Sequence, residues 1–231
     1  MTETNQKNTN NEYNNAGEKI IFLIQNNRRK LFIIFGCAVV LFAVFIGTLV
    51  VRSRFTMRDT ARVEEFTDRY DALRFTIAEE SSAEDVTALL TELSDFASGT
   101  SGYAGSRARA LIAGIHSDKK EWAEAEQAWR EAAKEAGKSY MTPIALFNAA
   151  AAAEEQGKIP EAIALYTECL TVRDLFPSAP RAQFAIGRLE EKRGNKEGAL
   201  EAYRTLRTNW PNDTMWKNLA QSRIIALGGE G

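Results

Sequence analysis

Two phenylalanines recur 37 positions apart, Phe147 and Phe184, and basic residues surround the second of them. Arg181, Arg188 and Lys192 lie three, four and eight residues from Phe184, so all of them share its face if the segment is helical. A ring flanked by cations can bury an apolar side chain and attract a carboxylate. The pattern therefore predicts a surface for an apolar, partly acidic peptide segment. The competing interpretation is that both rings pack between helices.

Other kinds of chemistry find little support in the sequence. The chain has one histidine, His116, late in an expected helix, and two cysteines, Cys37 and Cys169, far apart along the chain. A metal site or an activated thiol would need clustered ligands or a neighbouring base. Cys169 falls at a small-residue position, where a packing role is expected. The carboxylate pairs at 154–155 and 190–191 fit a solvated helical face. We therefore expect no enzyme, no metal and no cofactor.

The charge balance bears on the partners. The net charge is −2, and residues 1–30 carry five Lys and Arg against three Glu, so the remaining residues carry −4, the total less the +2 of this tail. A surface that binds nucleic acid needs a dense basic patch. We therefore expect partners that are proteins or peptide segments, and no nucleic acid.

The segment at 31–51 predicts a transmembrane helix. It contains no charged residue over 21 positions, and 15 of them are Leu, Ile, Phe or Val. A helix of this length covers roughly 31 Å, which matches a hydrocarbon core of about 30 Å. The run leaves through Val50, Val51 and Arg52 without the small residues of a cleavage site, so we expect an uncleaved anchor. Before it, residues 1–30 form a polar tail, disordered over 1–17, with a basic juxtamembrane end.

The orientation of this anchor is less well defined by the sequence. Four basic residues flank it on each side: Lys19, Arg28, Arg29 and Lys30 before it, and Arg52, Arg54, Arg58 and Arg62 after it. The contiguous triplet at 28–30 favours a cytoplasmic N terminus, and with it a C-terminal domain outside the cytoplasm. The tie leaves a cytoplasm-facing scaffold as the alternative.

Residues 52–101 predict a linker helix and a degenerate helical pair. An apolar stripe steps by three and four residues along a helix over about 58–80: Val63, Phe66, Tyr70, Leu73 and Ile77. The next helix is expected to begin at Ser81, and we expect the stripe to pack on it. The alternative is that the stripe is a seam for self-association, as in a structural envelope protein.

Small residues with a fixed period dominate residues 102–211. Ala125, Ala162 and Ala199 are 37 positions apart, each followed four residues later by an aromatic residue: Trp129, Tyr166 and Tyr203. Small residues let two helices cross closely, and the aromatic ring fills the gap to the next pair. This pattern resembles the tetratricopeptide repeat family, in three copies. Residues 212–231 predict a capping helix with Trp216, Leu219, Ile224 and Leu227 facing inward. The expected fold is all-α: one transmembrane helix, then a tetratricopeptide-type α-solenoid with its cap.

The resemblance implies where a ligand would bind. In such solenoids the first helix of each repeat lines the concave surface. Beside Glu154, the positions expected to face this groove are Arg107, Leu111, Phe147, Asn148, Arg181, Phe184, Arg188 and Lys192. We predict a protein-binding groove along them.

The wider layout resembles the YfgM-like ancillary subunits of the SecYEG translocon. A polar tail, a single span and a degenerate helical pair precede repeats that are entered through Ser101-Gly102-Tyr103-Ala104. The resemblance implies a single-pass protein of a bacterial inner membrane with a periplasmic repeat domain. It further implies an adaptor or chaperone-like role in protein translocation or envelope biogenesis, with translocon subunits or secreted chains as partners.

Overall fold

The computed structural model describes residues 27–77, 82–171 and 176–229, and these residues form helices and turns without any strand. The predicted disordered tail therefore lies outside the described residues. The helices are α2 (Arg28–Leu73), α3 (Ala83–Gly99), α4 (Gly102–Asp118), α5 (Trp122–Ala136), α6 (Met141–Glu155), α7 (Ile159–Cys169), α8 (Ala179–Lys192), α9 (Lys196–Asn209) and α10 (Thr214–Ala226). The chain divides into two compact units, residues 1–56 and 57–231.

The first unit contains the apolar part of α2. This helix is long and apolar enough to cross a membrane by length and composition, with a mean hydropathy of 2.8 over its most apolar window. Its apolar side chains are exposed, as a helix in lipid would have them. A helix near the N terminus with these properties is either a span or a signal sequence. The predicted span and the predicted linker helix are one continuous helix, because residues 48–73 contain no glycine or proline to end it.

The apolar stripe of the linker helix is buried inside the second unit. Val63 and Phe66 are 0% and 1% exposed and pack in one cluster with Leu89 of α3 and Leu111 of α4. The prediction that the stripe packs on the next helix is confirmed. The alternative seam for self-association is wrong, because α3 and α4 already cover the stripe.

The ends of this helical pair differ from the prediction. α2 ends at Leu73, where the hydroxyl of Thr76 donates to the Leu73 carbonyl at 3.2 Å and competes with the helical hydrogen bond. Ile77 follows in a turn and is still buried. α3 begins at Ala83, and the hydroxyl of Ser82 donates to Thr76 at 3.0 Å.

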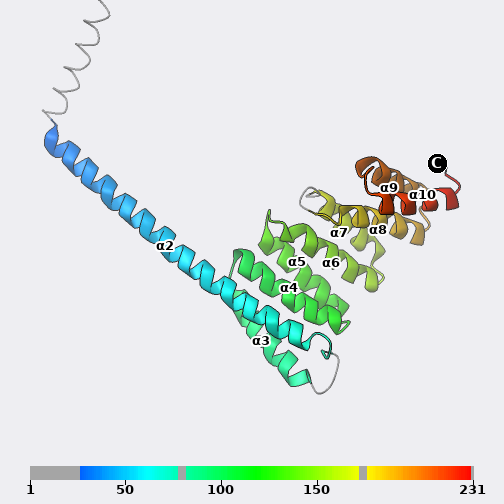
Figure 1. Cartoon of the computed structure of the whole chain (residues 1–231), viewed down its shortest axis with the longest axis horizontal. Coiled ribbons are helices and arrows are strands. Elements are labelled where there is room, and N and C mark those ends of the chain that lie inside the picture. The colour runs from blue at the N-terminus through cyan, green and yellow to red at the C-terminus, as the bar shows by residue number, and fades with distance from the viewer. Residues whose placement is uncertain (1–26, 78–81, 172–175, 230–231) are drawn as a thin grey trace, which may run out of the picture. The chain divides into compact units, whose positions relative to one another are not determined.

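Three helical hairpins follow: α4 with α5, α6 with α7, and α8 with α9, stacked in chain order (Figure 1). Ala125, Ala162 and Ala199 are all 0% exposed, as expected for small residues where two helices cross. The third hairpin has a close crossing. There a Cβ atom added to Gly187 of α8 would stand 2.5 Å from the ring of Tyr203 on α9. Glycine lets these two helices approach while the tyrosine stays wholly buried between them.

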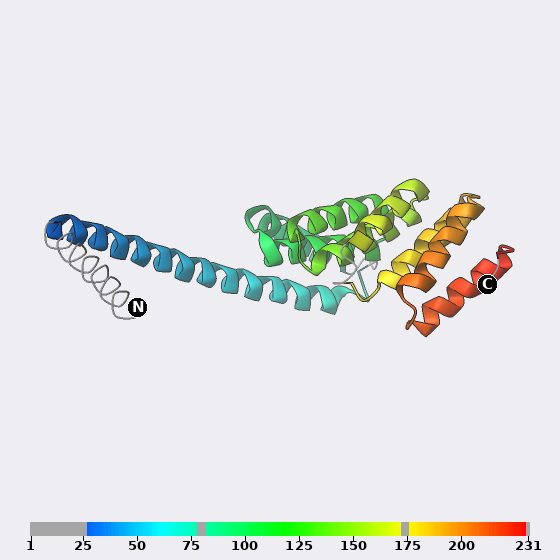
Figure 2. The same cartoon turned by 90° about the horizontal axis from the view of Figure 1, so that it is seen from above.

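α10 covers the end of this stack and packs against α9 and α8 (Figure 2). Ala220 and Ile224 are fully buried, and Trp216 and Leu227 pack beside them. Leu219 is 43% exposed, so its predicted inward position is wrong. The inward stripe steps from 216 to 220, 224 and 227, and at about 100° per residue Leu219 falls on its flank.

Candidate peptide-binding groove

Two adjoining hollows lie along the first helices of the repeats. The aromatic hollow, about 390 Å³, takes its rings from Phe147, Tyr166, Phe184 and Trp216 on α6, α7, α8 and α10. The tryptophan hollow, about 510 Å³, lies among the end of α2, α4, α5 and α6, and is lined by Trp122 and Trp129. Ala151 and Glu155 of α6 belong to both hollows. Together the hollows form one groove, which we call the inner groove.

Most of the predicted groove residues line it. Arg107, Leu111 and Asn148 line the tryptophan hollow, and Phe147, Arg181, Phe184 and Arg188 line the aromatic hollow. Leu111 is only 3% exposed, so it contributes to the core more than to the surface. Lys192, in the last turn of α8, lies outside both hollows.

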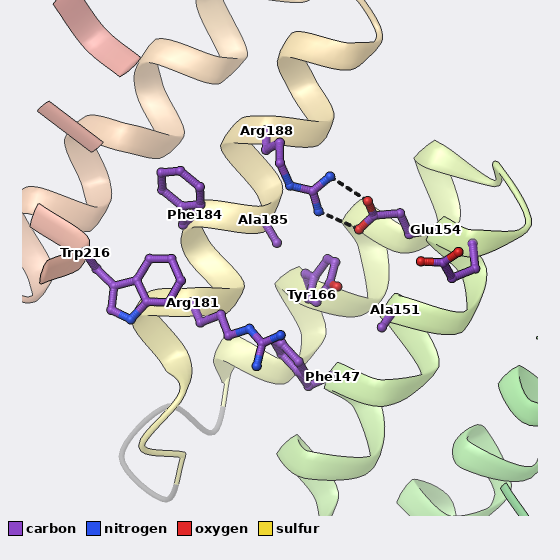
Figure 3. A pocket seen from close by; sticks show the side chains of 10 residues that line it. Phe147, Ala151, Glu154, Tyr166, Arg181, Phe184, Ala185, Arg188 and Trp216 are labelled. Carbon is purple, nitrogen blue, oxygen red and sulfur yellow. Dashed lines mark hydrogen bonds and ion pairs between the residues drawn. The ribbon is translucent and has the colours of Figure 1, made fainter. Parts of the chain in front are cut away.

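The two repeat-equivalent phenylalanines are half-buried and take part in both packing and surface. Phe147 lies 5.2 Å from Tyr166 between ring centroids, and Phe184 lies 5.3 Å from Tyr203 and 5.4 Å from Trp216. Such contacts hold aromatic rings in fixed orientations. Each ring still lines the aromatic hollow, as Figure 3 shows for Phe184 beside Trp216. The rings therefore do both things that the sequence suggested: they pack between helices, and they line a surface that a ligand could contact.

The predicted cluster of three cations is not formed. Arg188 donates two hydrogen bonds to the carboxylate of Glu154, at 2.5 and 2.7 Å, so its charge is already paired (Figure 3). The guanidinium of Arg181 lies over the ring of Phe147, 5.1 Å from the centroid. With Lys192 outside the groove, Arg181 is the cation that the aromatic hollow offers to a ligand. The sequence shows charge but not the intramolecular partner that neutralises it.

The carboxylates expected on a solvated face are mostly bound within the fold. Glu190 is 8% exposed and accepts from Arg193 at 2.5 Å and from Asn195 at 2.8 Å. Glu191 accepts from Arg223 and from the hydroxyl of Tyr203, and these hydrogen bonds hold its pKa below the usual range. Only Glu155 of the two pairs is exposed. A repeat spacing of 37 residues between Glu154 and Glu191 is the sequence signal that could have indicated their shared role.

The tryptophan hollow carries a different set of polar groups. The hydroxyl of Tyr70 donates to Asp118 at 2.7 Å, and the indole nitrogen of Trp129 donates to Ser117 at 3.3 Å. Among the residues that the structure describes, the side chains of Arg107 and Asn148 form no hydrogen bond or ion pair with another residue. These two groups are therefore available to a ligand.

The histidine and the buried cysteine have structural surroundings. His116 Nδ1 lies 2.6 Å from a carboxylate oxygen of Glu121 in the turn after α4. Cys169 is fully buried, and burial raises the pKa of its thiol to about 12. A thiol with this pKa is almost entirely protonated near neutral pH and does not act as a nucleophile. The predicted packing role of Cys169 agrees with this burial.

Stacked helical hairpins with a groove along their first helices define an α-solenoid. The family model of the tetratricopeptide repeat matches residues 115–171 and 169–214. The chain is 36% identical over 202 residues to a TPR repeat-containing protein of Treponema pallidum (strain Nichols). The matched region covers 80% of this chain and 83% of that protein. The chain therefore belongs to the tetratricopeptide repeat proteins.

A solved structure supports the fold. The crystal structure of the apo form of RapI has a TM-score of 0.51 with this chain at 15% identity, covering 72% of this chain and 69% of RapI. Tetratricopeptide repeats bind other proteins or peptides and are generally scaffolds without enzyme activity. The chain is accordingly a protein-binding adaptor.

Proposed function

We propose that this protein is a membrane-anchored adaptor with chaperone-like properties that holds a partner segment in the inner groove. The observation that carries the proposal is the aromatic hollow, in which rings from three successive structural units face one cavity of about 390 Å³. A buried aromatic cluster of this kind binds apolar side chains, and Arg181 at its edge attracts a nearby carboxylate. The partner segment is therefore apolar and carries an acidic residue.

An anchor of this kind would keep the groove close to a membrane surface. The exposed apolar stretch of α2 supports insertion, and the exposed basic residues 28–30 at its start support a cytoplasmic N terminus. On this orientation the repeats lie in the periplasm of a bacterial inner membrane. The resemblance in layout to ancillary translocon subunits supports a role in protein translocation or envelope biogenesis, with translocon subunits or secreted chains as partners.

A cytoplasm-facing scaffold is the second candidate, and the equal number of basic residues on the two sides of the span permits it. Protease added to intact spheroplasts decides between the two. For a periplasmic domain, the repeats beyond about residue 58 are digested without lysis. Protection until the spheroplasts are lysed would establish the scaffold. Co-purification after mild detergent extraction would then separate translocon subunits from other membrane partners.

The groove itself is tested by peptide binding to the full-length chain in detergent. The probe is a blocked nonapeptide of leucine and serine with one phenylalanine and one glutamate. We expect Phe184→Ala to weaken binding about tenfold at every salt concentration, because it removes apolar contact. Arg181→Glu should weaken binding most at low ionic strength, because it turns attraction into repulsion. Phe75→Ala is the matched control, since Phe75 is 91% exposed and lines neither hollow.

Circular dichroism melting of each variant separates loss of binding from loss of fold. A folded Phe184→Ala variant that binds the nonapeptide as tightly as the wild type would place the binding surface elsewhere on the protein.

A further inference from the structure

A bidentate ion pair recurs between successive first helices, and we call it the clasp. Glu154 near the end of α6 accepts two hydrogen bonds from Arg188 of α8. Glu191, 37 residues later near the end of α8, accepts two from Arg223 of α10. The clasp therefore ties the second repeat to the third, and the third repeat to the cap.

The junction between the first and second repeats lacks the clasp. A shift of 37 residues from Glu154 and Arg188 leads to Ser117 of α4 and Ala151 of α6. The tryptophan at 129 takes the place of Tyr203, and its indole donates to Ser117 as the tyrosine hydroxyl donates to Glu191. The first junction thus keeps the hydrogen bond from the aromatic residue, but it has Ala151 where the clasp has an arginine. An opening of about 510 Å³, the tryptophan hollow, lies where the arginine would be.

The charges around this opening suit a cation. Asp118 and Glu155 both line the hollow, and each lies at the end of its helix, where the backbone carbonyls add negative potential. Glu155 is exposed and has no ion pair among the described residues. Arg74 stands 4.0 Å from Asp118 and is 57% exposed, so this pair is weak. Arg107 lies eleven residues before Asp118 on α4, roughly 16 Å away along the helix.

We propose that an arginine of the bound partner segment fills the place of the missing clasp arginine. This inference rests on the proposed function, because it takes a segment in the inner groove as given. The guanidinium would lie against the indole of Trp129 and face the carboxylates of Asp118 and Glu155. Arginine fits better than lysine, because its planar fork stacks on aromatic rings and pairs with carboxylates in two-point contact.

The geometry also sets the spacing within the segment. First helices of adjacent repeats pack about 10 Å apart. An extended segment crosses this distance in about three residues. The partner segment therefore carries an arginine about three residues from the apolar side chain that enters the aromatic hollow.

The test uses the full-length chain in detergent and pairs of blocked nonapeptides. Each peptide has one phenylalanine and one glutamate and, three residues before or after the phenylalanine, either arginine or its neutral isostere citrulline. We expect the arginine peptide to bind at least about tenfold more tightly than the citrulline peptide, and the ratio to fall as salt rises. Glu155→Gln, at an exposed position, should reduce the ratio several-fold.

A second variant builds the clasp into the first junction. In Ser117→Glu/Ala151→Arg the new internal arginine should occupy the opening, raise the melting temperature and abolish the preference for arginine. Ser117→Gln/Ala151→Gln adds similar bulk without the ion pair, and it should not raise the melting temperature.

Three results would overturn the inference. Equal binding of arginine and citrulline peptides, with binding still lost in Phe184→Ala, would overturn it and leave the proposed function standing. Full arginine preference in the clasp variant with a raised melting temperature would overturn it as well. If neither peptide binds at any salt concentration, the inference and the proposed function both fail.

Discussion

The first and third repeats share one helical plan but are held by different interactions. In both, a small residue at the crossing is fully buried, Ala125 in one and Ala199 in the other. The third repeat adds a polar network around Glu190 and Glu191, whereas the first has the single hydrogen bond between Trp129 and Ser117 in the place of the clasp. The buried small residues are common to both repeats, so we infer that their contacts determine the fold. The polar contacts vary, and where they are absent the surface is free to bind a ligand.

The buried alanines at the helix crossings, which both repeats share, should be the positions most sensitive to mutation. Ala125→Leu and Ala199→Leu each force a larger side chain into a contact with no free surface, and we expect each to lower the free energy of unfolding by about 1–3 kcal/mol. Chemical denaturation of the full-length chain in detergent measures the change. Ala164→Leu is the control, because Ala164 is exposed on α7 and should change stability by less than about 0.5 kcal/mol. A damaging change in one repeat and a neutral one in the other would break the claim of a common framework.

This division explains how far the sequence could predict the fold. The period of 37 residues located the three hairpins, because the approach of two backbones restricts residue size at the crossing wherever the fold repeats. The continuity of α2 was missed because the change from apolar to charged composition at residue 52 suggested a boundary, while no helix-breaking residue marks one. A change in composition shows that the environment of the helix changes, for example from lipid to water. The helix itself ends only where its backbone hydrogen bonds end.

The sequence predicted which residues line the site better than it predicted which of their charges are free to bind a ligand. The face of the first helices follows from helical geometry, and it brought Phe147 and Phe184 to one hollow. The pairing of Arg188 with Glu154 depends on the distance between two helices and on side-chain conformations that local spacing does not determine. The predicted basic cluster failed for this reason, and the clasp became visible only with the structure.

The clasp should give the third repeat a pH dependence that the equivalent position of the first repeat, Ser117, lacks. Glu191→Gln removes the charge that Arg223 and Tyr203 stabilise, and we expect a loss of about 0.5–1.5 kcal/mol at pH 7, since Arg223 is 46% exposed. The folded-state pKa of Glu191 is lowered, so its contribution is present above the unfolded pKa of about 4.3 and is lost as the pH falls through the folded value.

Melting curves from pH 7 to pH 3 check this expectation. The difference between wild type and Glu191→Gln should shrink below about pH 4.3. The matched control is Ser117→Ala, at the equivalent position of the first repeat, whose difference from wild type should not vary with pH in this way. A constant difference for Glu191→Gln would show that the clasp does not stabilise the ionised carboxylate.

The smallest expected effect concerns the turn inside each hairpin. Lys120, Gly157 and Gly194 occupy the same position, and their φ angles of 61°, 75° and 82° all lie in the left-handed region. A residue with a side chain is strained there by about 1–2 kcal/mol, whereas glycine costs about 0.5–1 kcal/mol of additional chain entropy on folding. The difference favours glycine, so Lys120→Gly should stabilise the chain by up to about 1 kcal/mol, and Gly194→Ala should destabilise it by a similar amount. Lys120→Ala is the control at the same position, because alanine removes the same lysine side chain but does not relieve the positive φ of 61°. Stabilisation by Lys120→Gly together with an unchanged stability of Lys120→Ala would assign the effect to backbone conformation. If Lys120→Gly is destabilising instead, the first repeat tolerates its lysine without strain, and the two repeats differ in their turns as well as in their polar contacts.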